Sequence, residues 1–474
     1  MKYPRFLLAA AASGSGKTMI TCGILQILKN RGLKVSSFKC GPDYIDPMFH
    51  TKVLKTVSRN LDTFFTDEEM TRYLFTRTAQ ETEISVMEGV MGYYDGLGGV
   101  KEKASAYDLA RVTDTPVVLI VNAKGMSLSV LAQIKGFLEY KKDSRICGVI
   151  LNQMSGMICK ALAPKIEQEL GVRVYGYVPP IKDWHLESRH LGLVLPDEVE
   201  DLETQMQRLA GILEESLDVE GLLGLARSAP GLSASCPKPL ADMLSGQEAK
   251  KVQDCMPRIA VARDEAFCFL YEDNLRLLRD IGAEIVDFSP LHDCKVPSGV
   301  SGLLIPGGYP ELFAKKLSEN RSMCLDIKRA VQQGLPTLAE CGGFMYLHRE
   351  MENMEGETFE MAGVIDGRAY RTDKLGRFGY ITLMPASEVK ETASVGEKGF
   401  LGPIRGHEFH YFDSTACGAF YEARKPVGKR RWNCIHATEN SRMGFPHLYY
   451  YSNPAFALGF LEKCCEYAAG RKGK

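Results

Sequence analysis

Residues 13–18, Ser-Gly-Ser-Gly-Lys-Thr, have the composition and spacing of a phosphate-binding loop. Backbone N–H groups of such a loop can surround phosphate oxygens, and the N-terminus of a following helix favours negative charge. Lys17 is then expected to reach the terminal phosphates of a nucleotide, and Thr18 to offer its hydroxyl to Mg²⁺. Ala11 stands where the usual motif begins with glycine, so an ordinary strand–helix turn is the alternative interpretation. The lysine and threonine at the start of the expected helix favour the phosphate site.

Two acidic segments follow at positions suited to a metal–phosphate site. Residues 41–47, Gly-Pro-Asp-Tyr-Ile-Asp-Pro, come after an expected strand at 35–38, and Glu88 begins a second segment after an expected strand at 84–87. Open α/β sheets bind ligands at the C-terminal ends of their strands, and neighbouring glycines let the backbone approach a ligand closely. One such acid alone is as often a turn former or a helix cap. Several at one sheet edge indicate a ligand site.

Residues 336–344, Pro-Thr-Leu-Ala-Glu-Cys-Gly-Gly-Phe, predict a strand, a sharp turn and a helix. This is the geometry of a nucleophile elbow, with Cys341 in place of the usual serine. The two glycines permit the turn, the backbone N–H of Gly342 can face an oxyanion, and the helix N-terminus is expected to keep the cysteine as a thiolate. We expect a second oxyanion donor at Gly308, in the glycine loop at 306–311. The alternative is a buried structural thiol.

A thiol nucleophile needs a base, and three histidines compete for this role. His447 lies far downstream of the cysteine, as histidines of spatially assembled Cys–His pairs usually do. His407 and His410 are its rivals. Side chains three positions apart in a regular strand point to opposite faces, so these two can serve one site only if the strand is kinked. A structural role for any single histidine stays open.

The elements that must position these residues follow an α/β pattern. Short apolar runs alternate with helical patterns, which predicts βαβ units and mostly parallel sheets. The pattern lapses between about 226 and 257, where turn-forming residues are frequent. We therefore predict two α/β domains, at 1–235 and 258–474, joined by a linker at 236–257. The expected strands lie at 6–10, 35–38, 84–87, 116–121, 146–151, 174–178, 259–262, 284–288, 303–306 and 336–340.

The composition sets limits on the class of protein. A chain of 474 residues exceeds what one hydrophobic core usually serves, and 45% hydrophobic with 25% charged residues is ordinary for a globular protein. The formal net charge of -1 gives no reason to expect nucleic acid or an anionic membrane as a partner. The 14 cysteines are scattered, without a paired metal-binding spacing, and read as free thiols of a cytoplasmic protein. Neither a membrane span nor a signal peptide is expected.

Eight ordered motifs together resemble the cobyrinate a,c-diamide synthase family. They lie at 12–18, 39–47, 59–62, 88–92, 189–193, 307–311, 340–343 and 406–410. The resemblance implies an N-terminal P-loop domain with a parallel sheet, similar to dethiobiotin synthetase, and a C-terminal class I glutamine amidotransferase domain. It implies amidation of the a and c acetate side chains of a corrin ring with ATP, Mg²⁺ and glutamine. Each carboxylate is then activated as a carboxyl phosphate and attacked by ammonia released at the other site.

The resemblance also assigns roles to single residues. It implies Cys341 as nucleophile and His447 as its base. Tyr449 stands where the family often has a second histidine, and no third triad acid is evident downstream, so we expect a Cys–His dyad. The remaining assignments are ATP binding by Ser13, Gly14, Ser15, Gly16, Lys17, Thr18 and Asn152; metal ligation by Thr18, Asp46 and Glu88; substrate contacts by Asp43, Tyr44, Ile45 and Asp95; and oxyanion donation by Gly308 and Gly342.

Three functional hypotheses stay open at this point. The first is the corrinoid diamidation, and the second is the same chemistry on another tetrapyrrole such as nickel-sirohydrochlorin. The third is a nucleotide-switch ATPase whose glutaminase-like domain only binds, against which the intact elbow argues. Cobyric acid synthase fits the motifs at 41–47 and 59–62 less well. The expected partners are small molecules, namely ATP, glutamine and a corrinoid, and formation of a homodimer is left open.

Overall fold

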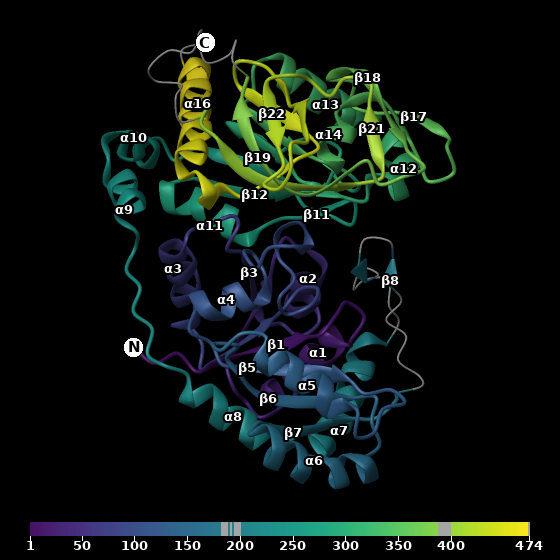
Figure 1. Cartoon of the computed structure of the whole chain (residues 1–474). Helices are drawn as coiled ribbons and strands as arrows, with labels where there is room; N and C mark the ends of the chain where they lie inside the picture. The colour runs from purple at the N-terminus through teal and green to yellow at the C-terminus, as the bar shows by residue number, and fades with distance from the viewer. Residues whose placement is uncertain (182–187, 190–191, 194–200, 387–399, 473–474) are drawn as a thin grey trace. The chain divides into compact units, whose positions relative to one another are not determined.

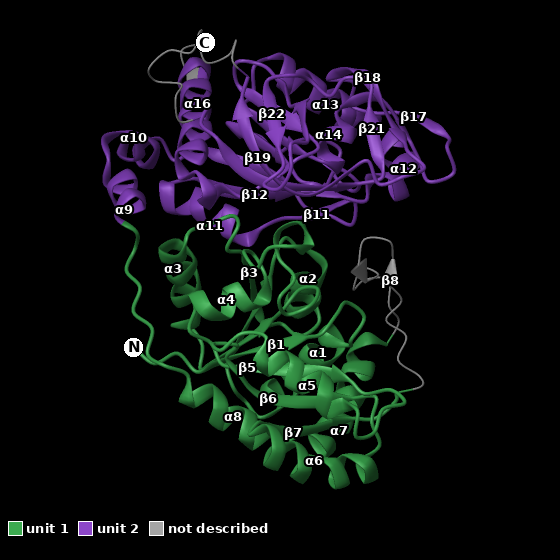
Figure 2. Cartoon of the chain, viewed as in Figure 1, with its two compact units in different colours: residues 1–237 green, residues 238–474 purple. Residues whose placement is uncertain are grey.

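The computed structural model describes residues 1–181, 188–189, 192–193, 201–386 and 400–472 (Figure 1). The chain divides into two compact units, Met1–Pro237 and Lys238–Lys474, called unit 1 and unit 2 below (Figure 2). His190 and Leu191 of the motif at 189–193 lie outside the described residues.

A parallel sheet of seven strands, in the order β3-β2-β4-β1-β5-β6-β7, forms the centre of unit 1 (Figure 1). Its middle strands are apolar and buried because helices cover the sheet. The strands are β1 (Arg5–Ala10), β2 (Val35–Cys40), β3 (Val57–Leu61), β4 (Ile84–Glu88), β5 (Val117–Asn122), β6 (Ile146–Asn152) and β7 (Arg173–Val178). A small hairpin of β8 (Ser188–Arg189) and β9 (Gly192–Leu193) lies outside this sheet.

The helices of unit 1 cover both faces of its sheet. Parallel crossovers are right-handed, so connections that run toward β3 put α1 and α2 on one face, and those that run toward β7 put α3 to α6 on the other. Contacts of α1 with α7, α3 with α4, and α5 with α6 agree with this division. The helices are α1 (Lys17–Asn30), α2 (Ile45–Lys52), α3 (Glu68–Ala79), η1 (Leu97–Gly99), α4 (Ala106–Val112), α5 (Val130–Glu139), α6 (Gly156–Leu170), α7 (Leu202–Ser216) and α8 (Val219–Ser228).

The crossovers leave the neighbouring strands β1 and β4 in opposite directions. Strand β1 continues through α1 toward β2, whereas β4 continues through α4 toward β5 on the other side. Such a switch point opens a crevice at the C-terminal ends of the two strands, which is where open α/β sheets bind ligands. The phosphate loop follows β1, and Glu88 is the last residue of β4. The topology therefore directs both expected ligand segments to one crevice.

Over its described residues, unit 2 contains a second mostly parallel sheet, in the order β12-β10-β13-β15-β25-β24, and three smaller sheets with antiparallel strand pairs. The strands of the main sheet are β10 (Arg258–Ala262), β12 (Glu284–Phe288), β13 (Gly302–Ile305), β15 (Thr337–Glu340), β24 (His436–Ala437) and β25 (Ser441–Gly444). The others are β11 (Phe267–Phe269), β14 (Gly307–Gly308), β16 (His348–Glu352), β17 (Thr358–Glu360), β18 (Ile365–Arg371), β19 (Arg377–Pro385), β20 (Ile404–His410), β21 (Phe412–Ser414), β22 (Tyr421–Arg424), β23 (Arg431–Cys434) and β26 (His447–Leu448).

Two helices occupy the expected linker at 236–257. The turn-rich composition ends at Pro237, and Leu240, Ala249 and Val252 are apolar residues whose burial stabilises α9 and α10. Helix α10 packs against α16, so this segment belongs to unit 2. The helices of unit 2 are α9 (Lys238–Ser245), α10 (Gln247–Cys255), α11 (Glu272–Ile281), η3 (Pro310–Phe313), α12 (Ala314–Glu319), α13 (Arg321–Gln332), α14 (Gly342–Tyr346), η5 (Tyr450–Ser452) and α16 (Pro454–Lys472).

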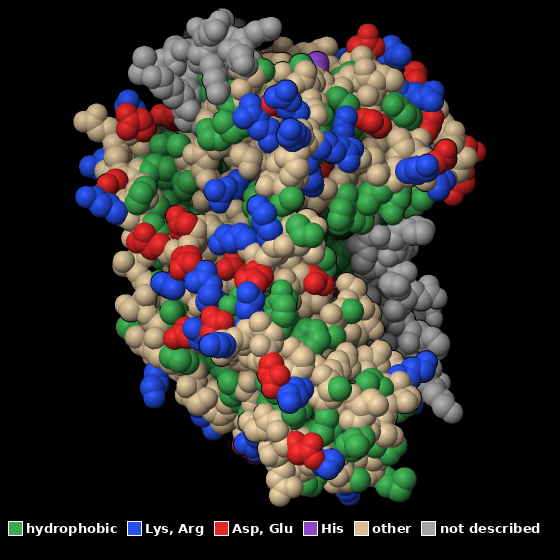
Figure 3. Space-filling model, viewed as in Figure 1, with side chains coloured by type: hydrophobic (Ala, Val, Ile, Leu, Met, Phe, Trp, Pro, Cys, Tyr) green, Lys and Arg blue, Asp and Glu red, His purple; other side chains and the backbone are tan. Residues whose placement is uncertain are grey.

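The distribution of charged side chains and the length of the helices are relevant to nucleic acid and membranes as partners. Basic and acidic side chains are interspersed over both units on the face drawn in Figure 3. Within the described residues, no helix combines the length and the apolar character needed to cross a bilayer.

Candidate active sites

The conformation of the phosphate loop in unit 1 depends on two left-handed glycines and on hydrogen bonds from its own lysine. Gly14 and Gly16 have φ values of 73° and 86°, which side chains with a Cβ rarely adopt. The Nζ of Lys17 donates to the carbonyl oxygens of Ala12, at 3.1 Å, and Met91, at 2.7 Å. Burial and the charge of Lys39 lower the pKa of Lys17 to about 8. The ammonium of Lys17 is thus hydrogen-bonded to backbone carbonyl oxygens, and phosphate oxygens can take their place as acceptors.

Asn152 contacts the backbone of the phosphate loop. Its Nδ2 donates to the carbonyl oxygen of Ser15 at 2.9 Å, and a Cβ added to Gly16 would lie 2.6 Å from the same nitrogen. Ser15 in turn donates its hydroxyl to the carbonyl of Ala12 at 2.9 Å. The observed role of Asn152 is to hold the loop, and its contact with adenine stays a prediction.

Thr18, Asp46 and Glu88 come together at the crevice. The hydroxyl of Thr18 donates to Glu88 Oε1 at 2.7 Å and lies 3.2 Å from Asp46 Oδ2. The three residues come from the start of α1, the first turn of α2 and the end of β4. The structure therefore brings all three predicted metal ligands into contact.

A fourth residue of this cluster, Lys39, escaped the sequence analysis. It is the penultimate residue of β2, only 4% exposed, and its Nζ pairs with Asp46 Oδ2 and, at 2.7 Å, with Glu88 Oε1. Burial opposes the charge of Lys39, but the carboxylates outweigh burial and raise the pKa of the lysine above its ordinary value. Burial raises the pKa of Glu88 to about 7 against the opposing effect of the lysine. Lys39 is the first residue of the motif at 39–47. A lysine near the end of an expected strand, directly before an acidic loop, was the sequence feature that could have predicted its place in this cluster.

The cluster fits a magnesium ion that shares its coordination with phosphate. Mg²⁺ in nucleotide sites uses one or two carboxylates, a hydroxyl and substrate phosphates rather than a cage of protein ligands. Glu88 is fully buried, and within the described residues its Oε2 has no hydrogen-bond partner, with His50 Nε2 3.7 Å away. A buried carboxylate oxygen without a partner is costly unless a ligand or ion completes it. The donor set and this oxygen both suit Mg²⁺.

The predicted substrate residues lie around the same crevice. Asp43 Oδ1 accepts the backbone N–H groups of Ile45, at 3.0 Å, and Asp46, at 3.1 Å, and so fixes the start of α2. Tyr44 and Ile45 are buried. Asp95 Oδ2 accepts the N–H of Gly92 at 2.9 Å in the segment after β4. These contacts shape the loops, and substrate binding by these residues stays a prediction.

In unit 2, Cys341 occupies a strained turn between β15 and α14. Its φ of 47° lies in the left-handed region, as expected for a nucleophile elbow. Its N–H donates to Gly444 of the neighbouring strand β25 at 2.8 Å, and a Cβ on Gly343 would lie 2.1 Å from the carbonyl of Ile305. The elbow predicted from the sequence is therefore present, and the glycine at 343 is required by close packing.

The environment of Cys341 opposes the expected thiolate. Burial, with the charges of Glu311 and Glu408, raises the pKa of Cys341 well above its ordinary value. The N–H of Gly342, at the start of α14, opposes this shift. A thiol with a raised pKa needs a base to become a nucleophile.

His447 lies beside this thiol, across one glycine. A Cβ built on Gly307 would be 2.4 Å from His447 Cε1 and 3.4 Å from Cys341 Cβ. Burial, followed by the charges of His407 and His410, holds the pKa of His447 well below 6.5. The imidazole is neutral at physiological pH and can accept a proton.

The two predicted oxyanion donors are also neighbours. A Cβ on Gly342 would lie 3.2 Å from the backbone nitrogen of Gly308, and the N–H of Gly342 points to the sulfur of Cys341. Gly308 pairs with Phe267 through the short strands β14 and β11. Two backbone nitrogens thus lie close to the nucleophile, as an oxyanion hole requires.

The rival histidines take different places in a regular strand. His407 is the register partner of His447 on β26, whereas His410 Nε2 contacts Glu408 Oε2 at 2.9 Å. His410 also stacks on Phe445, with ring centroids 4.1 Å apart. No kink brings the two histidines to one side. The proximity to Cys341 supports His447 as the base, and the dyad stays a prediction.

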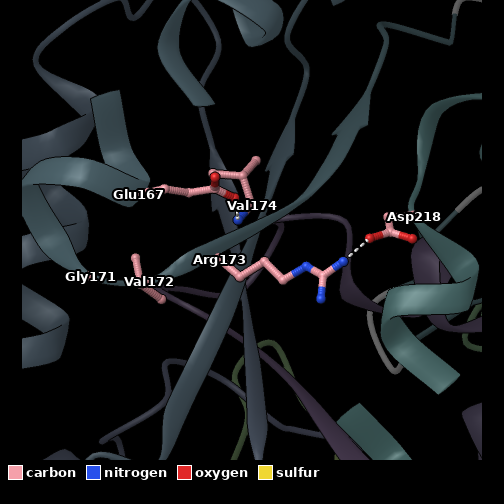
Figure 4. A pocket seen from close by; sticks show the side chains of 6 residues that line it. All are labelled: Glu167, Gly171, Val172, Arg173, Val174 and Asp218. Atoms are coloured by element: carbon pink, nitrogen blue, oxygen red, sulfur yellow. Dashed lines mark hydrogen bonds and ion pairs between the residues drawn. The ribbon is translucent and has the colours of Figure 1, made fainter. Parts of the chain in front are cut away.

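A surface hollow in unit 1 contains none of the predicted site residues. It is lined by Glu167, Gly171, Val172, Arg173, Val174 and Asp218 (Figure 4). Arg173 begins β7, so the hollow lies toward the N-terminal edge of the sheet, and its guanidinium pairs with Asp218 at 2.5 Å. The predicted chemistry lies at the opposite edge.

Comparisons with known proteins match both units. Residues 6–193 match the CobQ/CobB/MinD/ParA nucleotide binding domain, and residues 258–437 match the CobB/CobQ-like glutamine amidotransferase domain. The chain is 39% identical over 470 residues to the cobyrinate a,c-diamide synthase of Caldanaerobacter subterraneus subsp. tengcongensis, covering 98% of this chain and 99% of that protein. It is 40% identical over 460 residues to the enzyme of that name from Listeria innocua, covering 96% and 98%. It is 38% identical over 481 residues to that from Thermoplasma volcanium, covering 100% of both.

A P-loop nucleotide-binding unit followed by a glutamine amidotransferase unit defines a glutamine-dependent ligase that forms C–N bonds. The full-length similarity to relatives that share one name then gives the narrower assignment. The chain belongs to the cobyrinate a,c-diamide synthase family. The expected fold class, with its P-loop and amidotransferase domains, is confirmed.

Proposed function

We propose that the protein amidates the a and c acetate carboxylates of cobyrinate, in cobalamin biosynthesis, with ATP as activator and glutamine as nitrogen donor. The observation that carries this proposal is the presence, in one chain, of a phosphate loop whose Thr18 contacts Asp46 and Glu88 and of an elbow whose Cys341 lies beside His447. The names of the full-length relatives supply the substrate.

The chemistry explains why unit 1 binds a nucleotide. A carboxylate resists amidation at neutral pH because it offers only a very poor leaving group, and phosphorylation to a carboxyl phosphate corrects this. Mg²⁺, when bound, neutralises charge on the transferred phosphoryl group and the leaving phosphate. Thr18, Asp46 and Glu88 would hold this ion, and Lys17 would leave its backbone carbonyls for the phosphate oxygens. Asp43, Tyr44, Ile45 and Asp95 would line the site for the acid.

Unit 2 would supply the amine. The thiol of Cys341 attacks the side-chain amide carbon of glutamine while His447 accepts its proton, and the N–H groups of Gly308 and Gly342 stabilise the oxyanion. His447 returns the proton to the leaving ammonia, and water then hydrolyses the thioester to glutamate. Ammonia made in this way is un-ionised at the moment of release, whereas free ammonia at neutral pH is mostly ammonium. The ammonia displaces phosphate from the activated acid.

Mass spectrometry of the products tests the substrate. The purified full chain is incubated with ATP, Mg²⁺ and glutamine, and cobyrinate and nickel-sirohydrochlorin are offered in parallel. We expect conversion of cobyrinate to a product that has gained two amides. Preferential diamidation of nickel-sirohydrochlorin would instead establish the second tetrapyrrole hypothesis, and a gain of only one amide would contradict diamidation.

A variant of the phosphate loop separates the synthetase from the nucleotide-switch hypothesis. Lys17→Ala should abolish ATP-dependent amidation while glutamine hydrolysis in unit 2 persists. Unchanged amidation would reject the role of the loop. ATP hydrolysis by the unmodified chain without amide formation from either tetrapyrrole would favour the switch.

A further inference from the structure

The side chain of Lys39 lies on the two oxygens that the predicted metal ligands share. Its Nζ pairs with Asp46 Oδ2 and lies 2.7 Å from Glu88 Oε1. The hydroxyl of Thr18 contacts the same two oxygens, at 3.2 Å and 2.7 Å. The lysine ammonium thus occupies, beside the hydroxyl, the position in which a cation bridges the two carboxylates.

Electrostatics favours a cation at this place. Asp46 and Glu88 are 6% and 0% exposed, and two neighbouring buried carboxylates are strongly destabilising unless a positive charge compensates them. One lysine supplies that charge in the structure. A divalent ion on the same oxygens would lie within contact range of the ammonium, where like charges repel strongly in a buried site.

The lysine also has an alternative partner. Asp43 Oδ2 lies 3.9 Å from Lys39 Nζ, and the side chain of Asp43 is 30% exposed whereas that of Lys39 is 4% exposed. A lysine side chain has a flexible four-carbon stem, so small torsional changes can move its ammonium between acids. Asn60 keeps this acid in place, because its amide donates to the carbonyls of Gly41, at 3.0 Å, and Asp43, at 2.6 Å.

We propose that Lys39 is a displaceable counter-ion of the metal site, which neutralises Asp46 and Glu88 while no metal is bound and must leave them when a divalent cation binds. The ammonium then moves toward Asp43 and the crevice. This makes metal binding weak without nucleotide and strong with it, because nucleotide phosphates compensate both cations. The inference rests on the proposed Mg²⁺ role of Thr18, Asp46 and Glu88.

Binding of Mn²⁺ to the nucleotide-free full chain tests this competition. Free Mn²⁺ is measured by electron paramagnetic resonance during a titration. Lys39→Met keeps the length of the side chain without its charge, and we expect it to bind Mn²⁺ about tenfold more tightly than the unmodified chain, or better. Lys39→Arg keeps the charge and should bind as weakly as the unmodified chain. Lys103→Met is the matched control, since Lys103 pairs with Asp108 at 3.2 Å in the same unit and should leave the affinity unchanged.

Equal or weaker Mn²⁺ binding by folded Lys39→Met than by the unmodified chain would overturn the proposal. A different result would show that Thr18, Asp46 and Glu88 do not form a metal site at all. In that case the unmodified chain with ATP would bind no more Mn²⁺ than ATP alone binds in solution. A second readout avoids the substitution. Acetylation of Lys39 in the unmodified chain, quantified by mass spectrometry, should rise several-fold with saturating Mg²⁺ but not with NaCl of equal ionic strength. An unchanged acetylation rate would equally contradict displacement.

Discussion

The imidazole ring of His407 stacks on that of His447, with the ring centroids 4.9 Å apart and the ring planes 16° from parallel. The two residues face each other on the antiparallel strands β20 and β26. Burial, followed by the charge of Lys425, lowers the pKa of His407 to about 3. Both imidazoles are therefore neutral at physiological pH, and the neutral form of His447 is the one that can take a proton from Cys341.

The pH dependence of glutamine hydrolysis should reflect this environment. Because the pKa of His447 lies well below 6.5, kcat/KM should show no loss of activity from protonation of the base between pH 8 and 6.5. His407 is charged only near and below its pKa of about 3, so His407→Phe, which keeps a stacked ring, should leave kcat/KM unchanged over the same pH range. An inflection at pH 6.5 or above, in the wild type or in the variant, would contradict a buried neutral base.

A methyl group at Gly307 should separate the base from the nucleophile. Gly307→Ala would put a Cβ 2.4 Å from His447 Cε1, so the imidazole must shift. We expect glutamine-supported amidation to fall about 100-fold while ammonia-supported amidation persists, because misplacing a catalytic group by about 1 Å costs a factor of that size. Gly376→Ala, with no atom within 4 Å of the added Cβ, is the control and should keep both activities. Full glutaminase activity in Gly307→Ala would refute the placement of His447.

Thr18 should contribute to metal binding through its hydroxyl. Thr18→Ala removes the donor that reaches Glu88 Oε1 at 2.7 Å, and we expect the Mg²⁺ concentration that half-saturates ATP-dependent synthesis to rise about 10- to 100-fold. Thr18→Ser keeps the hydroxyl and should stay within a few-fold of the wild type. If the alanine and serine variants have the same Mg²⁺ requirement, the hydroxyl has no part in the metal site.

Ionisation of Glu340, the last residue of β15, should lower the free energy of unfolding at high pH. Burial raises its pKa to about 8, although the N–H of Leu448 opposes this shift. A carboxyl whose pKa is higher in the folded chain stabilises the fold fully below its ordinary pKa, 4.5, and loses this contribution as the pH rises through about 8. Glu340→Gln should therefore gain about 1–3 kcal/mol relative to wild type between pH 5.5 and 8, measured by urea unfolding. A difference that is the same at both pH values would count against a buried, protonated Glu340.

The sequence predicted the parts of the molecule that local patterns encode. The phosphate loop at 13–18 and the elbow at Cys341 depend on short glycine-rich segments at strand ends, and both are present in the structure. Strand β3 was not predicted, because Val-Ser-Arg-Asn-Leu is a partly polar edge strand without a continuous apolar run. The helices at 238–255 were missed because turn-forming residues just before them extended the apparent linker.

The environment of each side chain was harder to predict than its identity. Lys39 stands in a buried strand, and its importance appears only when Asp46 and Glu88 are brought to it from two other segments of the chain. The raised pKa of Cys341 likewise depends on burial and on the charges of Glu311 and Glu408, which are distant from it in the sequence. Local sequence therefore identified the chemical groups, and tertiary contacts decide their charges.

The central claim is that activated acid and ammonia are made by separate units, and Cys341→Ala tests it most directly. Amide formation is measured with cobyrinate and ATP, once with glutamine and once with an ammonium salt at alkaline pH, and Cys294→Ala controls for the loss of an exposed thiol. We predict a loss of at least about 1000-fold with glutamine and an unchanged rate with ammonia. Equal loss with both nitrogen sources, or retained activity with glutamine, would contradict the account.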